Sequence, residues 1–188
     1  MNLWFRLIWL MASARFRGKL TAPFATSRLP FRVWFHDLDT SLHMNNGRYW
    51  TIMDLGRTDL LLRMGLWRAV LRNGWVPVVG AGKIRFRREL RFWRAFALET
   101  RILCWGDTWA VIEHRIASRN TAGRDVINAV AMVKVGLYDR RSKAFVTIQT
   151  MMDEMNVAAE SPNPTPDVQA FLDAEDAMKR ATSERADT

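Results

Sequence analysis

The segment that most limits the fold of this chain is a strongly apolar helix predicted for residues 47–64. Apolar or small residues recur along it at spacings of three and four, as one face of an α-helix requires. Most of the remaining circumference is apolar too, and such a helix is stable only when it is largely enclosed. A sheet wrapped around this one helix would enclose it. The polar exceptions are Arg48, Asp54, Arg57, Asp59 and Arg63.

The order of the other predicted elements favours an α+β fold with one antiparallel sheet. One strand, at residues 30–35, precedes the helix, and several strands joined by short connections follow it. The alternating strand and helix order of a doubly wound fold is absent. After the helix we predict a short helix at 67–72, strands at 75–90, 95–105, 109–118 and 126–138, an edge strand at 144–148 and a last helix over 166–180.

The length of 188 residues, with 49% hydrophobic content, suits one globular domain with its own core. Within it we distinguish an N-terminal amphipathic segment with its linker (residues 1–28), the folded domain (29–150) and an acidic C-terminal linker and helix (151–188). The single cysteine, Cys104, excludes an internal disulfide and is typical of a reducing compartment. We expect Cys104 to be buried on its strand, and His114 to be a hydrogen-bonded core residue.

A dense polar cluster lies between the first strand and the central helix, and it predicts a reactive site. It combines carboxylates, imidazoles and carboxamides, and it ends where the helix begins. Asn45 or Asn46 is a suitable N-cap, and the N–H groups just beyond it have no partners inside the helix. A carboxylate facing this electropositive end could act as nucleophile or general base, which suggests acyl transfer. The cluster contains His36, Asp37, Asp39, His43, Asn45 and Asn46.

The pattern Asp-x-Asp-x-x-x-His-x-Asn-Asn-x-x-Tyr, carried by Asp37, Asp39, His43, Asn45, Asn46 and Tyr49, resembles the hot-dog-fold thioesterases of the 4-hydroxybenzoyl-CoA type. It is most similar to the branch containing thioesterase superfamily member six, over residues 29–138. The resemblance implies an antiparallel sheet curled around a central helix. It also implies a homodimer or homotetramer with active sites at the dimer interface. The catalytic carboxylate of the family corresponds to Asp39, and its oxyanion donor to the backbone N–H of Asn46.

On this basis we expect an acyl-CoA thioesterase that hydrolyses an acyl thioester to a free acid, with water as the final acceptor. The acyl chain would lie in an apolar channel beside the central helix, and Asn45, Gly47 and Tyr49 are expected near the substrate. His43 would orient Asp39 or its loop, or protonate the leaving thiolate. No separate cofactor is expected, because coenzyme A is part of the substrate; an acyl carrier protein thioester is the alternative carrier.

Asp54 is a second candidate carboxylate, because another hot-dog subgroup places its catalyst about two turns into the helix. The simpler interpretation is an ion pair with Arg57 at spacing i, i+3. We predict no metal site. The ligand types are suitable, but His36 points to the opposite face of the strand from Asp37 and Asp39.

There are two alternative functions, and one of them fits the spacing poorly. A hot-dog hydratase also uses an Asp and a His, but Asp37 and Asp39 precede His43 by six and four positions, which does not fit its motif. The stronger alternative is a non-catalytic acyl- or lipid-binding hot-dog protein at a membrane surface. Leu42 stands where many relatives have glycine, and this bulkier loop suits such a role.

The charge is concentrated in the first 150 residues. Residues 151–188 hold nine acidic and three basic residues, a balance of −6, so the rest carries +15 to give the net +9. No nucleic-acid-binding motif accompanies this charge, and we predict no nucleic-acid partner. Arg85, Arg87 and Arg88 are candidates to hold the phosphates of coenzyme A. A solvated outer face is the equally good alternative.

The N-terminal segment, residues 3–19, alternates aromatic and basic residues. Its apolar run is too short to span a bilayer and is interrupted by Arg6. A secretory signal is disfavoured because the positive cluster follows the apolar run. We therefore expect a cytoplasmic protein whose segment contacts a membrane surface. The alternative is a helix that packs only on its own domain or on a dimer partner.

Overall fold

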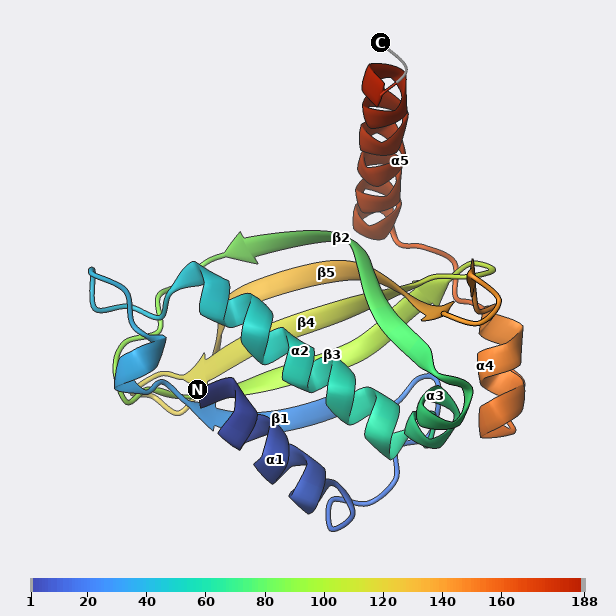
Figure 1. Ribbon diagram of the computed structural model, residues 1–188. Coiled ribbons are helices and arrows are strands. Elements are labelled where there is room, and N and C mark those ends of the chain that lie inside the picture. Colours follow the sequence, from blue (N-terminus) through green and yellow to red (C-terminus); the bar gives the residue numbers. More distant parts are fainter. Residues whose placement is uncertain (1, 187–188) are drawn as a thin grey trace.

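The computed structural model describes residues 2–186, and its centre is one curved antiparallel sheet (Figure 1). The main strands pair in the order β1-β3-β4-β5-β2, and the short β6 (Ala144–Phe145) pairs with β5. This architecture confirms the predicted α+β hot-dog fold, with one sheet and a central helix. The main strands are β1 (Ser27–Arg32), β2 (Trp75–Phe86), β3 (Ala95–Trp105), β4 (Ala110–Arg119) and β5 (Asp125–Asp139).

The central helix α2 (Asn46–Arg63) crosses one face of the sheet, as its apolar circumference predicts (Figure 1). Ile52 and Met53 are fully buried and belong to one core cluster with residues of β3, β4 and β5. Gly56 brings the helix close to β3. A Cβ there would lie 2.8 Å from Leu98 Cδ2 and closer still to Thr100 Oγ1. Only glycine allows this approach without displacing the side chains of Leu98 and Thr100.

The segment after β5 differs from the prediction. The strand expected at residues 144–148 ends at Phe145, and a helix that the sequence analysis did not foresee, α4 (Ile148–Met155), follows. Thr147 starts this helix, since its hydroxyl accepts a hydrogen bond from the N–H of Thr150 at 3.2 Å. Met151 is buried in a cluster with α3 (Trp67–Asn73) and β2. The boundary expected at residue 150 falls inside α4.

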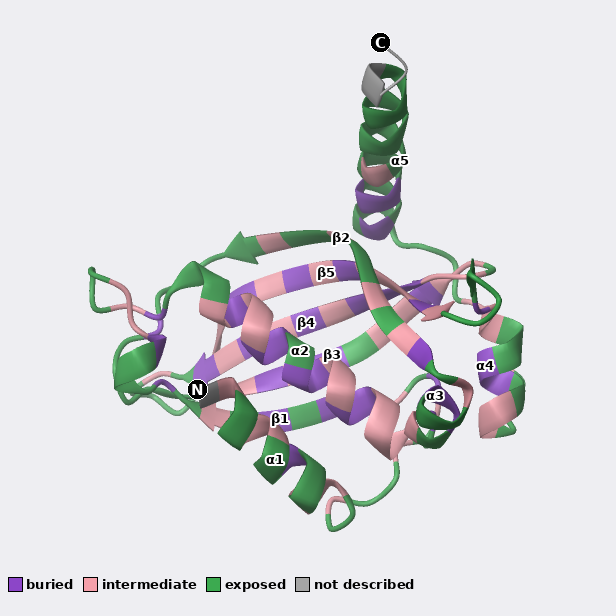
Figure 2. Cartoon of the chain, viewed as in Figure 1, coloured by how far each residue is buried: buried purple, intermediate pink, exposed green. Residues whose placement is uncertain are grey.

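The last helix, α5 (Pro166–Ala186), projects away from the sheet (Figure 1). Only its beginning is buried (Figure 2). Val168, Phe171 and Leu172 there belong to one core cluster with Cys104 and Val111. Cys104 is thus a buried strand residue, as expected. Lys134 of β5 and Glu175 of α5 form an ion pair of 2.6 Å that ties the helix to the sheet.

The N-terminal segment forms α1 (Asn2–Ala14), which lies beside α2 and β1 (Figure 1). Leu10 is buried with Leu29 and Leu55, and Leu3 and Leu7 pack against the same cluster. The opposite side of α1 is exposed (Figure 2). Among the described residues, no helix is long and apolar enough to cross a membrane.

Candidate functional site

The polar cluster forms a tightly folded loop, residues 34–45, which we call the motif loop. It begins with a 3-10 turn, Phe35–Asp37, and closes through backbone hydrogen bonds. Asn45 N–H donates to Asp37 O at 2.8 Å, and Asp39 N–H donates to His43 O at 2.9 Å. Leu42 adopts a φ of 60°, a left-handed conformation that suits glycine better than leucine. The motif loop therefore contains a strained backbone turn at Leu42, directly before His43.

Asp39, the predicted catalytic carboxylate, is half-buried in this loop. Its Oδ1 accepts hydrogen bonds from the N–H groups of Ser41 and His43, at 2.9 and 3.4 Å. Within the described residues its Oδ2 accepts none. The loop thus fixes one carboxylate oxygen and leaves the other available, which is a useful arrangement for a nucleophile or a general base.

The start of α2 lies next in the chain, and Asn45 is its N-cap. The Asn45 side chain accepts a hydrogen bond from the Gly47 N–H at 2.8 Å. The Gly47 N–H is therefore already used, whereas the Asn46 N–H has no protein acceptor within residues 2–186. Asn46 and Gly47 are both exposed. Of the N–H groups of Asn46 and Gly47, that of Asn46, the predicted oxyanion donor, is the one left available.

His43 and Tyr49 point to a residue that the sequence analysis missed, Glu89. His43 Nε2 lies 2.7 Å from Glu89 Oε2, and within the described residues no hydrogen bond or ion pair joins the imidazole to the Asp39 carboxylate. Tyr49 is buried in the core, edge-on to Phe86 at 5.1 Å between ring centroids. Burial and the nearby Glu89 carboxylate raise the pKa of Tyr49 to about 12. No spacing in the sequence could have linked Glu89 to a motif that lies forty to fifty-two residues earlier.

The first aspartate of the motif, Asp37, is the more deeply buried one, with a side chain 1% exposed. Its carboxylate meets Arg6 of α1 at 2.6 Å and Arg48 of α2 at 3.7 Å. His36 Nε2 lies 3.5 Å away, and burial lowers the pKa of this imidazole. In the described part of the chain, no group of three His, Cys, Asp or Glu residues is placed to hold a metal ion.

The predicted phosphate ligands lie on the surface. Arg85 is the last residue but one of β2, and Arg87 and Arg88 come directly after the strand, where their backbone N–H groups donate to Asn128 O at 2.8 and 3.1 Å. All three side chains are exposed, and none forms an ion pair with another described residue. β2 ends at Phe86, four residues before the predicted end.

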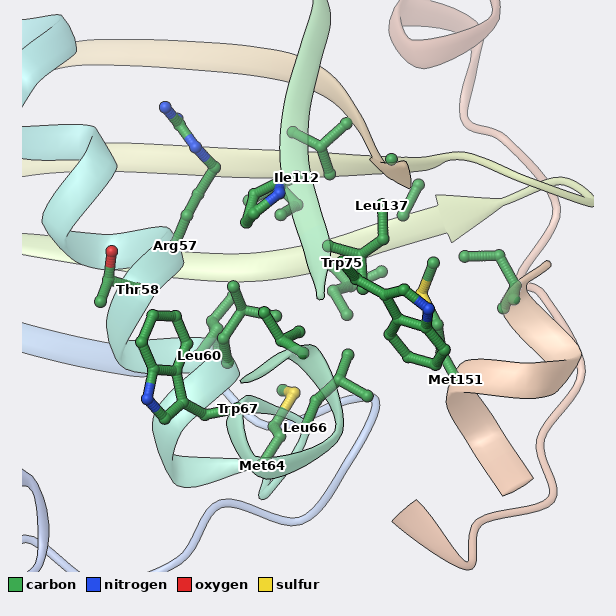
Figure 3. A pocket seen from close by; sticks show the side chains of 18 of the residues that line it. Arg57, Thr58, Leu60, Met64, Leu66, Trp67, Trp75, Ile112, Leu137 and Met151 are labelled. Atoms are coloured by element: carbon green, nitrogen blue, oxygen red, sulfur yellow. The ribbon is translucent and has the colours of Figure 1, made fainter. Parts of the chain in front are cut away.

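A cavity of about 520 Å³ lies between α2, α3, α4 and the first half of β2 (Figure 3). Its walls are apolar, and its polar end is formed by Asp54, Arg57 and Thr58. None of the motif residues Asp37 to Tyr49 lines it. Asp54 is eight residues after Asn46, about 12 Å along the helix at 1.5 Å per residue. The walls include Leu60, Met64, Leu66, Trp67, Trp75, Ile112, Leu137 and Met151 (Figure 3).

The polar end of the cavity is anchored in the sheet. Arg57 pairs with Asp54, as predicted, and its Nη1 lies 3.0 Å from His114 Nε2. His114 Nδ1 lies 3.0 Å from Thr100 Oγ1. His114 is fully buried, and this burial, with the Arg57 cation adding to it, holds its pKa well below 6.5. His114 is therefore the hydrogen-bonded core residue that was expected, and it fixes the Arg57 side chain.

Comparison with known proteins agrees with the fold. A family model described as Thioesterase-like superfamily matches residues 33–172. Protein THEM6 from Xenopus laevis is 39% identical over 97 residues, 52% of this chain and 45% of that protein. Protein THEM6 from Danio rerio is 33% identical over 121 residues, 63% of this chain and 60% of that protein. The chain thus spans about half the length of the curated relatives it matches.

Solved structures of thioesterases share the fold. 4-Hydroxybenzoyl CoA thioesterase from Pseudomonas sp. strain CBS-3 superposes with a TM-score of 0.61 at 17% identity, covering 69% of this chain and 98% of that one. A gentisyl-coenzyme A thioesterase gives a TM-score of 0.59 at 20% identity, covering 68% and 99%. Because the family model covers well over half of the sequence, this chain belongs to the thioesterase-like superfamily.

Proposed function

We propose that this protein hydrolyses acyl-CoA thioesters, with Asp39 as the reactive carboxylate and the start of α2 as the oxyanion site. The observation that carries the proposal is the motif loop. It holds one oxygen of Asp39 with two backbone N–H groups, leaves the other oxygen available, and ends at a helix N-terminus whose Asn46 N–H has no protein acceptor in the described chain. Membership of the thioesterase-like superfamily supports the reaction class.

In this mechanism the thioester carbonyl accepts a hydrogen bond from the Asn46 N–H, and the positive end of the helix dipole stabilises the negative charge that develops on the oxygen. A preorganised donor of this kind lowers the barrier by about 3 kcal/mol. Asp39 either attacks the carbonyl carbon, which breaks the C–S bond, releases the coenzyme A thiolate and leaves an anhydride that water then hydrolyses, or it removes a proton from a water molecule whose attack breaks the same C–S bond. No cofactor takes part in these steps.

The remaining substrate contacts follow from the surface and the cavity. The acyl chain would occupy the apolar cavity beside α2, and the exposed Arg85, Arg87 and Arg88 would contact the phosphates of coenzyme A. Asp54, at the polar end of this cavity, is the alternative carboxylate. We further propose a homodimer or homotetramer in the cytoplasm, with α1 in contact with a membrane surface.

A second function has its own supporting observation. Gly47 N–H is already bound by the Asn45 side chain, and Leu42 holds the loop in a conformation unusual for leucine. A protein that binds acyl-CoA or lipid without turning it over would tolerate both features. A non-catalytic acyl-binding protein is therefore the alternative, and the experiment must distinguish it from a thioesterase.

The test is thiol release from a panel of acyl-CoAs, short to long and aromatic, by wild type, Asp39→Ala and Asp54→Asn. We expect Asp39→Ala to lose at least about a hundredfold in kcat, while Asp54→Asn stays active. Asp107→Ala, an exposed aspartate in the turn after β3, is the matched control and should match wild type. Loss of activity in Asp54→Asn alone would move the reaction to the cavity. Acyl-CoA binding without turnover by the folded wild type would establish the binding protein instead.

A further inference from the structure

The N-terminal helix reaches the motif loop through one guanidinium group. Arg6 of α1 contacts both oxygens of Asp37, with Nη2 at 2.6 Å from Oδ2 and Nη1 at 3.3 Å from Oδ1. The same Nη2 donates to the backbone oxygen of Arg32 at 3.3 Å. The Arg6 side chain is 14% exposed and that of Asp37 is 1% exposed. This is a largely buried, two-point contact between segments thirty-one residues apart.

Asp37 is also the point where the motif loop is closed. Its Oδ2 accepts a hydrogen bond from the Trp34 N–H at 2.9 Å, at the start of the loop. Its backbone oxygen accepts one from the Asn45 N–H at 2.8 Å, at the end of the loop. Asp39 lies between these two closures. A shift of Asp37 would therefore move both the proposed reactive carboxylate and the cap of α2.

A second helix contributes to the same contact. Arg48 of α2 places its Nε 3.7 Å from Asp37 Oδ1, and its Nη2 donates to the His36 oxygen at 3.0 Å. One buried carboxylate is thus shared by cations from α1 and α2. A buried carboxylate that loses such a partner is left with an uncompensated charge, and the structure around it must rearrange or admit water. Arg48 alone, at the longer distance, replaces little of what Arg6 provides.

We infer that Arg6 is a positioning residue for the motif loop. Through Asp37, α1 holds the loop in the geometry that presents Asp39 beside the start of α2. α1 therefore contributes to the geometry of the site, in addition to any contact that its outer face makes. The catalytic consequence of this inference rests on the proposed thioesterase function; the conformational consequence does not.

The conformational arm measures amide hydrogen exchange of residues 34–45 in Arg6→Met, which keeps the apolar stem and removes the charge. We expect exchange in this segment to be about tenfold faster than in wild type, while the middle of α2 keeps its protection. Arg6→Lys keeps the charge but cannot contact both carboxylate oxygens as a guanidinium does. Its exchange rate in residues 34–45 should lie between those of wild type and Arg6→Met. The control is Arg72→Met, which breaks an exposed two-point pair with Glu154 elsewhere. Wild-type exchange of residues 34–45 in Arg6→Met would overturn the inference.

A double-mutant cycle shows whether the effect passes through Asp37. In Asp37→Asn the charge that Arg6 neutralises is gone, so adding Arg6→Met should cause little further increase in exchange of residues 34–45. Equal and independent effects of the two substitutions would contradict the proposed route. Uniformly faster exchange over the whole chain in Arg6→Met would mean that α1 supports overall stability only, and would also overturn it.

The kinetic arm uses the acyl-CoA that wild type hydrolyses best. Arg6→Met should lower kcat about tenfold with little change in KM, because a displaced Asp39 affects the reacting centre more than the cavity. Arg6→Lys should recover part of the rate, and Arg72→Met should match wild type. If wild type hydrolyses no acyl-CoA, the proposed function fails, and the exchange experiment still decides the role of Arg6.

Discussion

His114 lies between the sheet and the central helix, and its two hydrogen bonds fix its protonation state. Arg57 can only donate, so His114 Nε2 must accept, and the ring proton therefore sits on Nδ1, facing Thr100 Oγ1. The charged group that faces the ring is Arg57, and a protonated imidazole would be repelled by it inside the core. Gly56 makes this network possible, since a side chain there would displace Thr100.

The buried His114 predicts that the free energy of unfolding falls in mild acid. Its pKa in the folded protein lies well below 6.5, and that of an unfolded chain lies near 6.5. Below that pH the unfolded state binds a proton that the folded state does not. Stability is therefore retained above pH 6.5 and lost as the pH falls, by up to about 1.4 kcal/mol per pH unit. Urea unfolding at a series of pH values measures this slope.

The contribution of His114 is isolated by comparison with His114→Gln. The glutamine can still accept a hydrogen bond from Arg57 but does not titrate. The slope of the free energy of unfolding against pH should therefore be smaller in His114→Gln, by the contribution of about one proton. His36→Gln serves as the control, because the His36 side chain is 37% exposed and its pKa is lowered less far than that of His114, so its removal should change the slope less. Identical slopes for wild type and His114→Gln would show that the folded protein binds the same proton.

Individual residues of the site were predictable only where the chain itself brings them together. Asp39, Asn45 and Asn46 are close in sequence, and a strand followed by a helix places them near one helix end. The partners that hold the loop come from distant segments: Arg6 lies on α1, and Glu89 follows β2. Their positions depend on how the helices pack on the sheet, which no local spacing encodes. The sequence also did not show that Asp37 is buried more deeply than Asp39, because this too depends on how the helices pack.

At the level of elements, α1 has two distinct faces. Leu3, Leu7 and Leu10 attach it to the domain. Its outer face leaves Trp4 69% and Trp9 54% exposed, and Arg15 and Lys19 follow in the next segment. Tryptophan and basic residues together are typical of helices that lie in the headgroup region of an anionic bilayer. Packing on the domain and contact with a surface are therefore compatible.

We expect the full chain to bind vesicles of anionic phospholipid more strongly than zwitterionic ones, with weaker binding at high salt. Trp4→Ala/Trp9→Ala should lower the bound fraction about tenfold or more, because two aromatic side chains no longer enter the interface. Leu71→Ala, an exposed apolar residue on α3, is the matched control. Cosedimentation measures the bound fraction, and equal binding by all three proteins would exclude α1 as the contact.

The helices and strands show where sequence patterns succeed and where they fail. The apolar α2 and the alternating strands β3 to β5 have periodicities long enough to identify, and their short connections indicate antiparallel pairing. α4 is one short helix after a two-residue strand, and its apolar positions are equally compatible with an edge strand. What decides its form is the packing of Met151 against α3 and β2, a tertiary contact.

At the scale of the whole molecule, the sheet ends on one side at β2, a long strand whose outer edge pairs with no other described residue. Val79 is 52% exposed and Phe86 41% exposed along it. Long apolar edges are normally covered, since they otherwise invite uncontrolled pairing. β1, at the other side, is half as long, six residues against twelve, and contains Pro30. We therefore predict that two copies pair through β2.

The prediction is that wild type has twice the chain mass of 21.8 kDa in solution, measured by light scattering after gel filtration. Val79→Lys should shift the protein toward the monomer, because a charge placed on the shared edge must be desolvated or must separate the strands. Leu71→Lys introduces the same charge at an exposed position of α3 and should leave the mass unchanged. A monomeric wild type would contradict the predicted pairing, and a Val79→Lys protein that stays dimeric would place the contact between the copies elsewhere than at β2.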